Sequence, residues 1–197
     1  MCRLVETIKL KDGIFENMDI HNERFNISRK SLFSLNEIID LNEILKLHEF
    51  SKTGLFKCRV VYNQEILKVE FIPYVLKQIY SLRLVNAEIK YPYKYEDRTD
   101  INKLFELREN CDDILIVNND RMTDTSAANI AFFDGDRWYT PLKPLLKGTE
   151  REKLLRSKKI FGEDIRLSDL NKFQKATIFS TMVNFCDIII PVTNILG

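Results

Sequence analysis

Cysteine and histidine are scarce in this sequence, and neither occurs in a pattern that binds metal. The four cysteines lie far apart, no Cys-x-x-Cys pair is present, and there are only two histidines. Zinc sites and disulfide frameworks need closely spaced or paired cysteines. This usage predicts a reduced, cytoplasmic protein with no metal site and no structural disulfide.

An excess of charge of one sign and long apolar runs are also missing. The chain has 30 basic and 29 acidic side chains and a net charge of +1, without a basic tract. Such a balance does not favour nucleic-acid binding. The apolar runs are too short to cross a bilayer, and the first residues lack the apolar core of a signal peptide. We therefore expect neither a nucleic-acid partner nor a membrane partner.

The 197 residues, 45% of them hydrophobic, suffice for one large or two small packed domains. Alternating residues predict strands at 4–10, 56–62 and 66–71, and helix-like spacing predicts helices over 27–39 and 40–50. We expect these elements to form a small N-terminal α/β domain over residues 1–76. Residues 77–86 are then a connector, and residues 87–197 form the second domain.

The second domain begins, by the same patterns, with a tyrosine-rich strand at 87–95 and a helix at 98–108. A buried strand at 112–117 leads to a hairpin of strands 129–133 and 137–140 around the turn Asp134-Gly135-Asp136. A helix follows from residue 149, then a strand at 176–182 and a closing strand at 188–195. The expected fold class is therefore α/β, or more strictly α+β.

Polar residues cluster around the predicted hairpin. Asp124 lies in Thr-Asp-Thr-Ser-Ala-Ala-Asn, where small side chains allow the backbone to approach a ligand closely. Downstream, Leu146-Lys147-Gly148-Thr149-Glu150-Arg151 opens a helix. The first backbone N–H groups of a helix have no intrahelical acceptor and suit a phosphate. The stretch 118–151 is thus the candidate site.

This stretch resembles the class IV aminotransferases, the pyridoxal-phosphate enzymes of fold type IV. That family has an acidic residue, four residues, an asparagine, a short hairpin, Thr-Pro, and a glycine-containing helix start ending in Arg. Here these are Asp124, Asn129, Thr140-Pro141 and 147–151. The N-terminus is similar too, with Glu-Thr-Ile at 6–8, Asp-Gly at 12–13 and His-x-x-Arg at 21–24.

The resemblance implies a two-domain fold with a larger, mixed, β-barrel-like C-terminal domain, a homodimer, and pyridoxal 5'-phosphate as cofactor. It implies that Lys94 forms the Schiff base with the cofactor. Lys90 is the competing lysine, at a less suitable spacing from Asp124. The resemblance also implies that Arg24 reaches the cofactor phosphate, a role for which its fork of donors is suited.

The remaining cofactor contacts also follow from the resemblance. Asp124 pairs with the pyridine nitrogen, and Asn129 belongs to the same motif. Thr149 and Glu150 offer backbone N–H groups to the phosphate, while Ser180 and Thr181 supply hydroxyls to it.

Two departures from the family bear on activity. The family has Glu where this chain has Asp124, and the Ser-Arg-Gly turn of many relatives is replaced by Tyr62-Asn63-Gln64. Two activities stay open: amino-group transfer on a small amino acid, and lyase cleavage of aminodeoxychorismate to 4-aminobenzoate and pyruvate. A degenerate homologue that acts as a non-catalytic binding or structural protein is the alternative.

Overall fold

The structure, a computed structural model, describes residues 2–197, and their packing forms two compact units. The first unit runs to Leu76 and also includes Tyr93–Asp97. The second comprises Lys77–Pro92 and Arg98–Gly197. The chain therefore leaves the first unit, returns to it for a few residues, and leaves again. The sequence patterns assigned that short return segment to the second domain.

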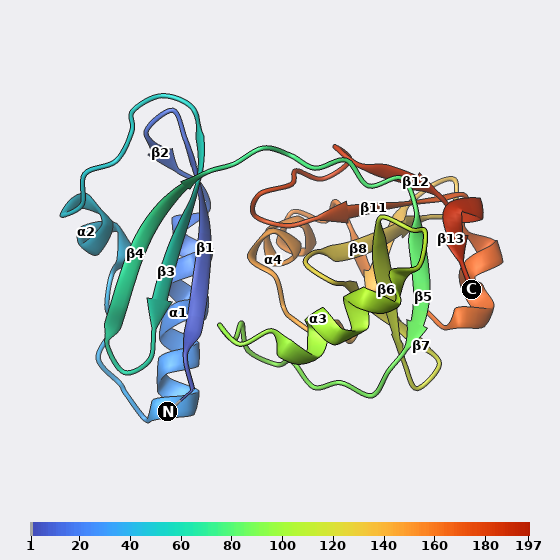
Figure 1. The fold of residues 1–197 in the computed structure, drawn as a ribbon, viewed down its shortest axis with the longest axis horizontal. Helices are drawn as coiled ribbons and strands as arrows, with labels where there is room; N and C mark the ends of the chain where they lie inside the picture. The colour runs from blue at the N-terminus through green and yellow to red at the C-terminus, as the bar shows by residue number, and fades with distance from the viewer. Residues whose placement is uncertain (1) are drawn as a thin grey trace. The chain divides into compact units, whose positions relative to one another are not determined.

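The first unit is an antiparallel sheet with one helix along its face (Figure 1). The strand order is β2-β1-β3-β4, and each neighbouring pair is antiparallel. The elements are β1 (Leu4–Lys11), β2 (Ile14–Phe15), α1 (Met18–Phe33), α2 (Leu41–Lys46), β3 (Leu55–Tyr62) and β4 (Ile66–Pro73). The strands predicted from alternation are confirmed here.

The long helix of this unit differs from the prediction over 27–39. It begins at Met18 and ends at Phe33, and Ser34 follows in the left-handed region with φ 59°. Met18 and Phe25 are buried against Leu4 and Ile8 of β1. The buried face of the helix therefore starts upstream of the apolar run on which the prediction was based.

The second unit contains two sheets. One has the order β10-β9-β8-β11-β12 and the other β13-β5-β6-β7, and each mixes parallel and antiparallel pairs. Its strands are β5 (Leu82–Asn86), β6 (Asp113–Asn118), β7 (Arg121–Thr125), β8 (Asn129–Phe133), β9 (Trp138–Pro141), β10 (Phe161–Glu163), β11 (Lys175–Phe179), β12 (Ile189–Pro191) and β13 (Ile195–Leu196). Its helices are α3 (Thr99–Phe105), α4 (Thr149–Arg156), and the short 3-10 helices η1 (Glu106–Arg108), η2 (Leu167–Lys172) and η3 (Val192–Asn194).

The mixed α/β fold class and the hairpin of β8 and β9 are confirmed. Within residues 2–197 the second unit has two sheets rather than one closed barrel. The expected closing strand is divided into β12, η3 and β13. Pro191 explains the break, because proline has no N–H for a sheet ladder.

The tyrosine-rich strand predicted at 87–95 was wrong. The strand of this region is β5, which lies in the expected connector and pairs in parallel with β6. Leu82 and Val85 of β5 are buried. The tyrosines Tyr93 and Tyr95 instead pack against the core of the first unit, where Leu4 bridges to Tyr95. Their alternation reflects that packing and not a strand of the second unit.

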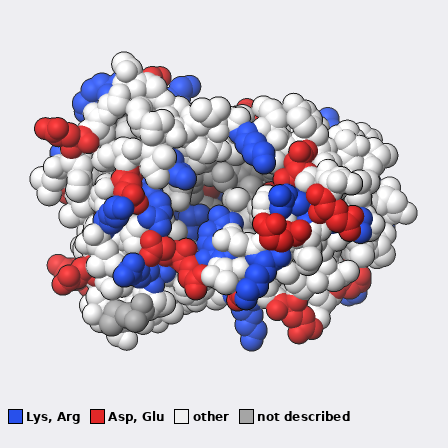
Figure 2. Space-filling model, viewed as in Figure 1, with Lys and Arg blue, Asp and Glu red and all other residues white. Residues whose placement is uncertain are grey.

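Acidic and basic side chains are intermixed on the face shown in Figure 2. The ion pairs of the first unit include Arg59 with Glu70 at 2.8 Å and Arg59 with Glu96 at 2.7 Å. Among the described residues, no helix is long and apolar enough to span a membrane.

Candidate active site

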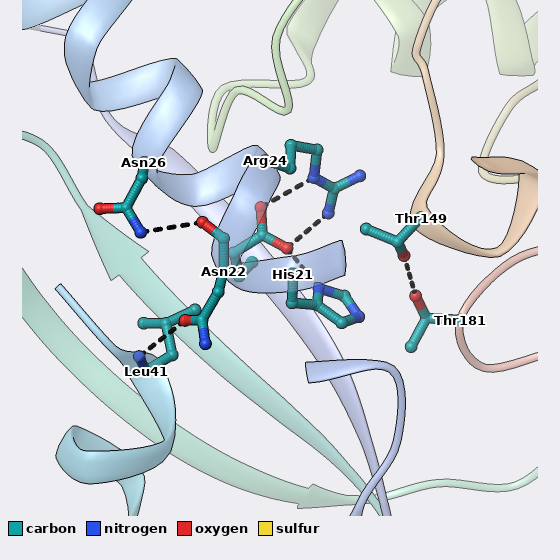
Figure 3. Close-up of polar contacts among 8 residues, drawn as sticks. His21, Asn22, Arg24, Asn26, Leu41, Thr149 and Thr181 are labelled. Carbon is teal, nitrogen blue, oxygen red and sulfur yellow. Dashed lines mark hydrogen bonds and ion pairs between the residues drawn. The ribbon is translucent and has the colours of Figure 1, made fainter. Parts of the chain in front are cut away.

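In the first unit a buried carboxylate, that of Glu6, is the hydrogen-bond partner of both His21 and Arg24. Alternation along β1 directs Glu6 to the same side as Leu4 and Ile8, toward α1, and Glu6 is fully buried. His21 and Arg24 lie three residues apart on α1, so both reach the same face of the helix. The Nε and Nη2 atoms of Arg24 donate to Glu6 at 2.8 and 2.5 Å (Figure 3).

The third partner of Glu6 is His21, whose Nδ1 lies 2.6 Å from the carboxylate. Burial alone would raise the pKa of Glu6, but the charge of Arg24 and the hydrogen bond from His21 lower this pKa to about 2. Burial lowers the pKa of His21, against the opposing effect of Glu6. A neutral imidazole beside an ionised carboxylate, which only accepts, must carry its proton on Nδ1.

Lys94 also belongs to the first unit. Its carbonyl oxygen accepts a hydrogen bond from the N–H of Val5 at 2.9 Å, which fixes its backbone beside Glu6 on β1. Its charge contributes to lowering the pKa of His21. Lys90, the competing lysine, belongs to the second unit and is exposed, whereas Lys94 is half-buried. The Schiff-base role of Lys94 stays a prediction.

In the second unit, Asp124 and Asn129 form a buried pair at the facing ends of β7 and β8. Asn129 Nδ2 donates to Asp124 Oδ1 at 2.8 Å and to the Leu146 carbonyl at 2.9 Å. The N–H of Leu146 donates to Asp124 Oδ2 at 2.9 Å. Burial raises the pKa of Asp124 to about 6, although these hydrogen bonds act to lower it. The pair thereby ties the segment before α4 to two strands.

The position of Asn129 in this pair explains why residue 148 is a glycine. It is the N-cap of α4, and a Cβ at this position would collide with the side-chain oxygen of Asn129. Glycine is therefore required here by a close approach of side chain to backbone. The Gly-Thr-Glu-Arg helix start is specified by the asparagine that the sequence motif placed nineteen residues earlier.

Two hydroxyl groups meet at the start of α4. The hydroxyl oxygens of Thr149 and Thr181 lie 2.8 Å apart, as drawn in Figure 3. Because Phe179 at the end of β11 pairs with Asn129, the turn that carries Ser180 and Thr181 begins beside the Asp124 pair. The prediction had extended this strand to residue 182. Helix-start N–H groups and hydroxyls together make a set of neutral donors suited to an anion.

The remaining predicted residues, Ser180 and Glu150, form contacts within this turn and this helix. Ser180 Oγ accepts from the N–H of Met182 at 3.2 Å, which supports the tight turn. The Glu150 carboxylate lies 3.6 Å from Lys153 Nζ. Arg151 is buried and donates to the Pro141 carbonyl at 2.8 Å. Among the described residues its Nε has no hydrogen-bond partner.

Sequence reasoning gave no role to Glu6 and His21, which the structure joins to Arg24 in one buried cluster. Both belong to the motifs that carried the resemblance, Glu-Thr-Ile and His-x-x-Arg, but only Arg24 was given a role. A signal was available, because a Glu at an inward position of an apolar strand needs a cationic or hydrogen-bonding partner.

Comparison with known proteins identifies the family. The sequence model of the family described as Amino-transferase class IV matches residues 100–195. An uncharacterized protein of Haemophilus influenzae (strain ATCC 51907 / DSM 11121 / KW20 / Rd) is 35% identical over 92% of this chain and 98% of its own length.

Two solved structures extend the comparison. A candidate 4-amino-4-deoxychorismate lyase from Haemophilus somnus 129PT is 32% identical, with a TM-score of 0.87 over 93% of this chain and 98% of that chain. The pyridoxal-phosphate-bound form of a hypothetical aminotransferase from Mycobacterium tuberculosis shares the fold, with a TM-score of 0.73 and 15% identity over 95% of this chain and 80% of that chain. The protein belongs to the class IV aminotransferase family.

Proposed function

We propose that this protein is a pyridoxal-phosphate-dependent enzyme that acts on an amino acid or an amino-chorismate. The observation that carries the proposal is a set of neutral hydrogen-bond donors at the start of α4, in the unit that also holds the buried carboxyl group of Asp124. The Thr149 and Thr181 hydroxyls lie 2.8 Å apart at the start of α4, and Asp124 hydrogen-bonds the segment leading into that helix. A phosphate and a pyridine ring nitrogen require these two kinds of group.

The donor set fits the cofactor in chemistry and in charge. Neutral hydroxyls and backbone N–H groups can bind phosphate oxygens by hydrogen bonds, so this end of the site needs no buried cation. The family resemblance leads us to assign Arg24 to the cofactor phosphate as well. The side chain of Glu150 pairs with Lys153, so this residue would serve the phosphate through its backbone. Ser180 would act by holding the turn that carries Thr181.

Bound pyridoxal phosphate supplies the electron sink that stabilises a carbanion at the substrate Cα. The residues of this chain bind, orient and transfer protons around that step. We assign Lys94 as the amine that holds the cofactor covalently and then moves the proton at the substrate Cα. Its backbone is anchored by the Val5 N–H, so the amine extends from a fixed position.

Asp124 would hold a proton at the ring nitrogen. Hydrogen bonds from Asn129 and Leu146 fix the plane of its carboxyl group, and each oxygen keeps a second lone pair. A protonated nitrogen nearby would favour the charged carboxylate and lower the pKa of Asp124 from about 6. The exchange of the family's Glu for Asp preserves this charge.

Of the two activities, the lyase reaction has the support of the relative from Haemophilus somnus, which is named as a candidate 4-amino-4-deoxychorismate lyase. Amino-group transfer is the second candidate, which the name of the fold relative from Mycobacterium tuberculosis favours. The relatives named above give no support to the alternative of a non-catalytic homologue.

The test is to purify the protein with pyridoxal phosphate and assay aminodeoxychorismate beside a panel of amino donors. Equimolar 4-aminobenzoate and pyruvate, formed without a keto-acid acceptor, would support the lyase. Turnover that requires a keto acid would support transfer. A protein that binds no pyridoxal phosphate would overturn the proposal. The homodimer implied by the family resemblance is tested by sedimentation, where a strict monomer at micromolar concentration would contradict it.

A further inference from the structure

Glu6 is a buried charge to which the proposed mechanism assigns no task. It lies on β1 between Leu4 and Ile8, two fully buried apolar side chains, and is itself fully buried. A carboxylate in such a place costs stability unless cationic partners and hydrogen bonds compensate it. The side chains that compensate it here are Arg24 and His21.

We propose that Glu6 is a positioning residue that sets the orientation of the Arg24 guanidinium for the cofactor phosphate. This inference rests on the proposed function, in which Arg24 binds that phosphate. Glu6 contacts no part of the cofactor in this proposal and acts through Arg24.

The geometry of the pair supports this role. The two oxygens of Glu6 accept from Nε and Nη2 of Arg24 at 2.8 and 2.5 Å, a bidentate contact along one edge of the guanidinium. A guanidinium carries five N–H donors in a rigid plane, so fixing one edge also fixes the direction of the donors on the other edge. The Arg24 side chain is 15% exposed, so part of it can be reached by a ligand while it is paired with Glu6.

His21 restrains the carboxylate from a second direction. Its Nδ1 lies 2.6 Å from the oxygen that also accepts from Nη2 of Arg24. Because the imidazole is fully buried, it cannot turn toward solvent to release Glu6. The carboxylate is therefore held in one orientation, and its two hydrogen bonds hold the Arg24 guanidinium in one orientation as well.

The experiment is a double-mutant cycle in the full-length protein with Glu6→Gln, Arg24→Ala and the double variant. The dissociation constants of pyridoxal phosphate and of pyridoxal, which lacks the phosphate, are measured for each. We expect Glu6→Gln to weaken pyridoxal phosphate about tenfold, equivalent to about 1.4 kcal/mol, and to leave pyridoxal unchanged. In the Arg24→Ala background the same substitution should cost nothing further.

Two additional variants separate position from charge. Glu6→Asp keeps the charge but shortens the reach, so it should also weaken pyridoxal phosphate and spare pyridoxal. It serves equally if Glu6→Gln does not fold. Glu70→Gln is the matched control, because it breaks a carboxylate–Arg59 pair of the same unit, at 2.8 Å, without touching Arg24. It should leave both affinities as in the wild type.

The outcomes distinguish this inference from the proposed function. If the wild type binds no pyridoxal phosphate, or if Arg24→Ala leaves its affinity unchanged, the proposed function or the role of Arg24 fails. If Arg24→Ala weakens pyridoxal phosphate but the Glu6 variants do not, the inference alone fails. It also fails if Glu6→Gln tightens binding, if pyridoxal weakens equally, or if the loss persists without Arg24.

Discussion

Each unit buries a carboxyl group of the candidate site, Glu6 in the first and Asp124 in the second, and the pKa values of these two groups are shifted in opposite directions. Glu6 of the first unit is fully buried and has its pKa lowered to about 2. Asp124 of the second unit is 5% exposed and has its pKa raised to about 6. Burial raises both values, so the difference must come from the partners.

The partners differ in charge. Glu6 accepts two hydrogen bonds from the guanidinium of Arg24, whereas Asp124 accepts from the neutral Asn129 amide and the Leu146 N–H. The cation Arg151 lowers the pKa of Asp124 only as a secondary effect. A carboxylate already paired with a cation gains little from a second one. Asp124 is therefore the carboxyl group that a protonated ring nitrogen would stabilise most, and Glu6 is suited to a structural task.

The largest effect is expected from Lys94→Ala, which tests whether the reacting amine belongs to the first unit. Without the amine, covalent attachment of the cofactor and proton transfer at the substrate Cα are both lost. Activity should fall by several orders of magnitude, and the unfolding midpoint should change little because Lys94 is half-buried. Borohydride reduction followed by peptide mass spectrometry should find the cofactor on the Lys94 peptide of the wild type and on none in the variant.

Lys90→Ala is the control from the second unit. It removes an exposed lysine four residues away and should keep both the label and the activity. Loss of the label in Lys90→Ala but not in Lys94→Ala would move the reacting amine to the second unit and make the predicted register wrong.

The next effect is expected from Asp124→Asn, which removes the charge and nearly preserves the shape. If the carboxylate keeps the ring nitrogen protonated, kcat should fall by about 10² or more, as for other losses of electrostatic stabilisation in active sites. The cofactor should remain bound through its phosphate. Asp124→Glu should retain more activity than Asp124→Asn, because it keeps the charge at the cost of crowding Asn129 and Leu146. Full turnover in Asp124→Asn would reduce Asp124 to a residue that anchors the segment before α4.

Much of the fold could be predicted from local patterns. The β8–β9 hairpin follows from alternating residues around Asp134-Gly135-Asp136. The first strand has the predicted bounds, and the second lies one residue further along than predicted. The return of the chain to the first unit at Tyr93–Asp97 could not be predicted in this way. Tyr93 and Tyr95 alternate like a strand, but both pack against the core of the first unit, where Tyr95 forms a bridge with Leu4 near the N-terminus. A contact of such long sequence separation leaves no local periodicity.

The candidate site likewise contains some residues that local motifs indicate and others that depend on contacts between distant parts of the sequence. Motif spacing indicated Asp124, Asn129 and Thr149, and the structure brings Asp124 and Asn129 into contact. The link between Thr149 and Thr181 joins residues far apart in the sequence and rested on the family resemblance alone. The role of Glu6 could not be predicted without the fold either, because it depends on which face of β1 lies against α1.

The opposite pKa shifts predict opposite pH dependence of the free energy of unfolding without cofactor. The folded-state pKa of Glu6, about 2, lies below the ordinary value of 4.5, so its stabilisation is present above pH 4.5 and lost toward pH 2. The folded-state pKa of Asp124, about 6, lies above the ordinary value of 3.8, so the contribution of Asp124 to stability is greatest below pH 3.8 and is lost as the pH rises through 6. A tenfold change in the acid dissociation constant on folding corresponds to about 1.4 kcal/mol.

Denaturant unfolding of the wild type, Glu6→Gln and Asp124→Asn across this range measures both effects. Relative to the wild type, Asp124→Asn should gain stability as the pH rises from about 4 to about 7, by an amount that follows from the shifted pKa. Glu6→Gln should lose most of its disadvantage in strong acid. Parallel curves for all three proteins would mean that the two carboxyl groups do not differ as described.

The smallest effects should separate Arg24, the proposed charged ligand of the phosphate, from Thr149 and Thr181, the proposed neutral ligands. Thr149→Val and Thr181→Val each remove a hydroxyl and keep a β-branched shape. Each should weaken pyridoxal phosphate about fivefold, the usual net worth of one neutral hydrogen bond. The double variant should cost less than the sum, because each single change also leaves the other hydroxyl without the partner that it has at 2.8 Å.

Salt distinguishes the two kinds of ligand. An ionic contact of a partly exposed guanidinium is screened at high ionic strength, whereas a hydrogen bond between neutral groups is affected much less. The loss of affinity in Arg24→Ala, about tenfold at low salt by the strength of a charge-assisted hydrogen bond, should therefore shrink as salt is raised. The losses in the Thr149 and Thr181 variants should stay constant. If the threonine losses shrank in parallel with that of Arg24, the second unit would bind the phosphate through charge, and the contrast between the units would not hold.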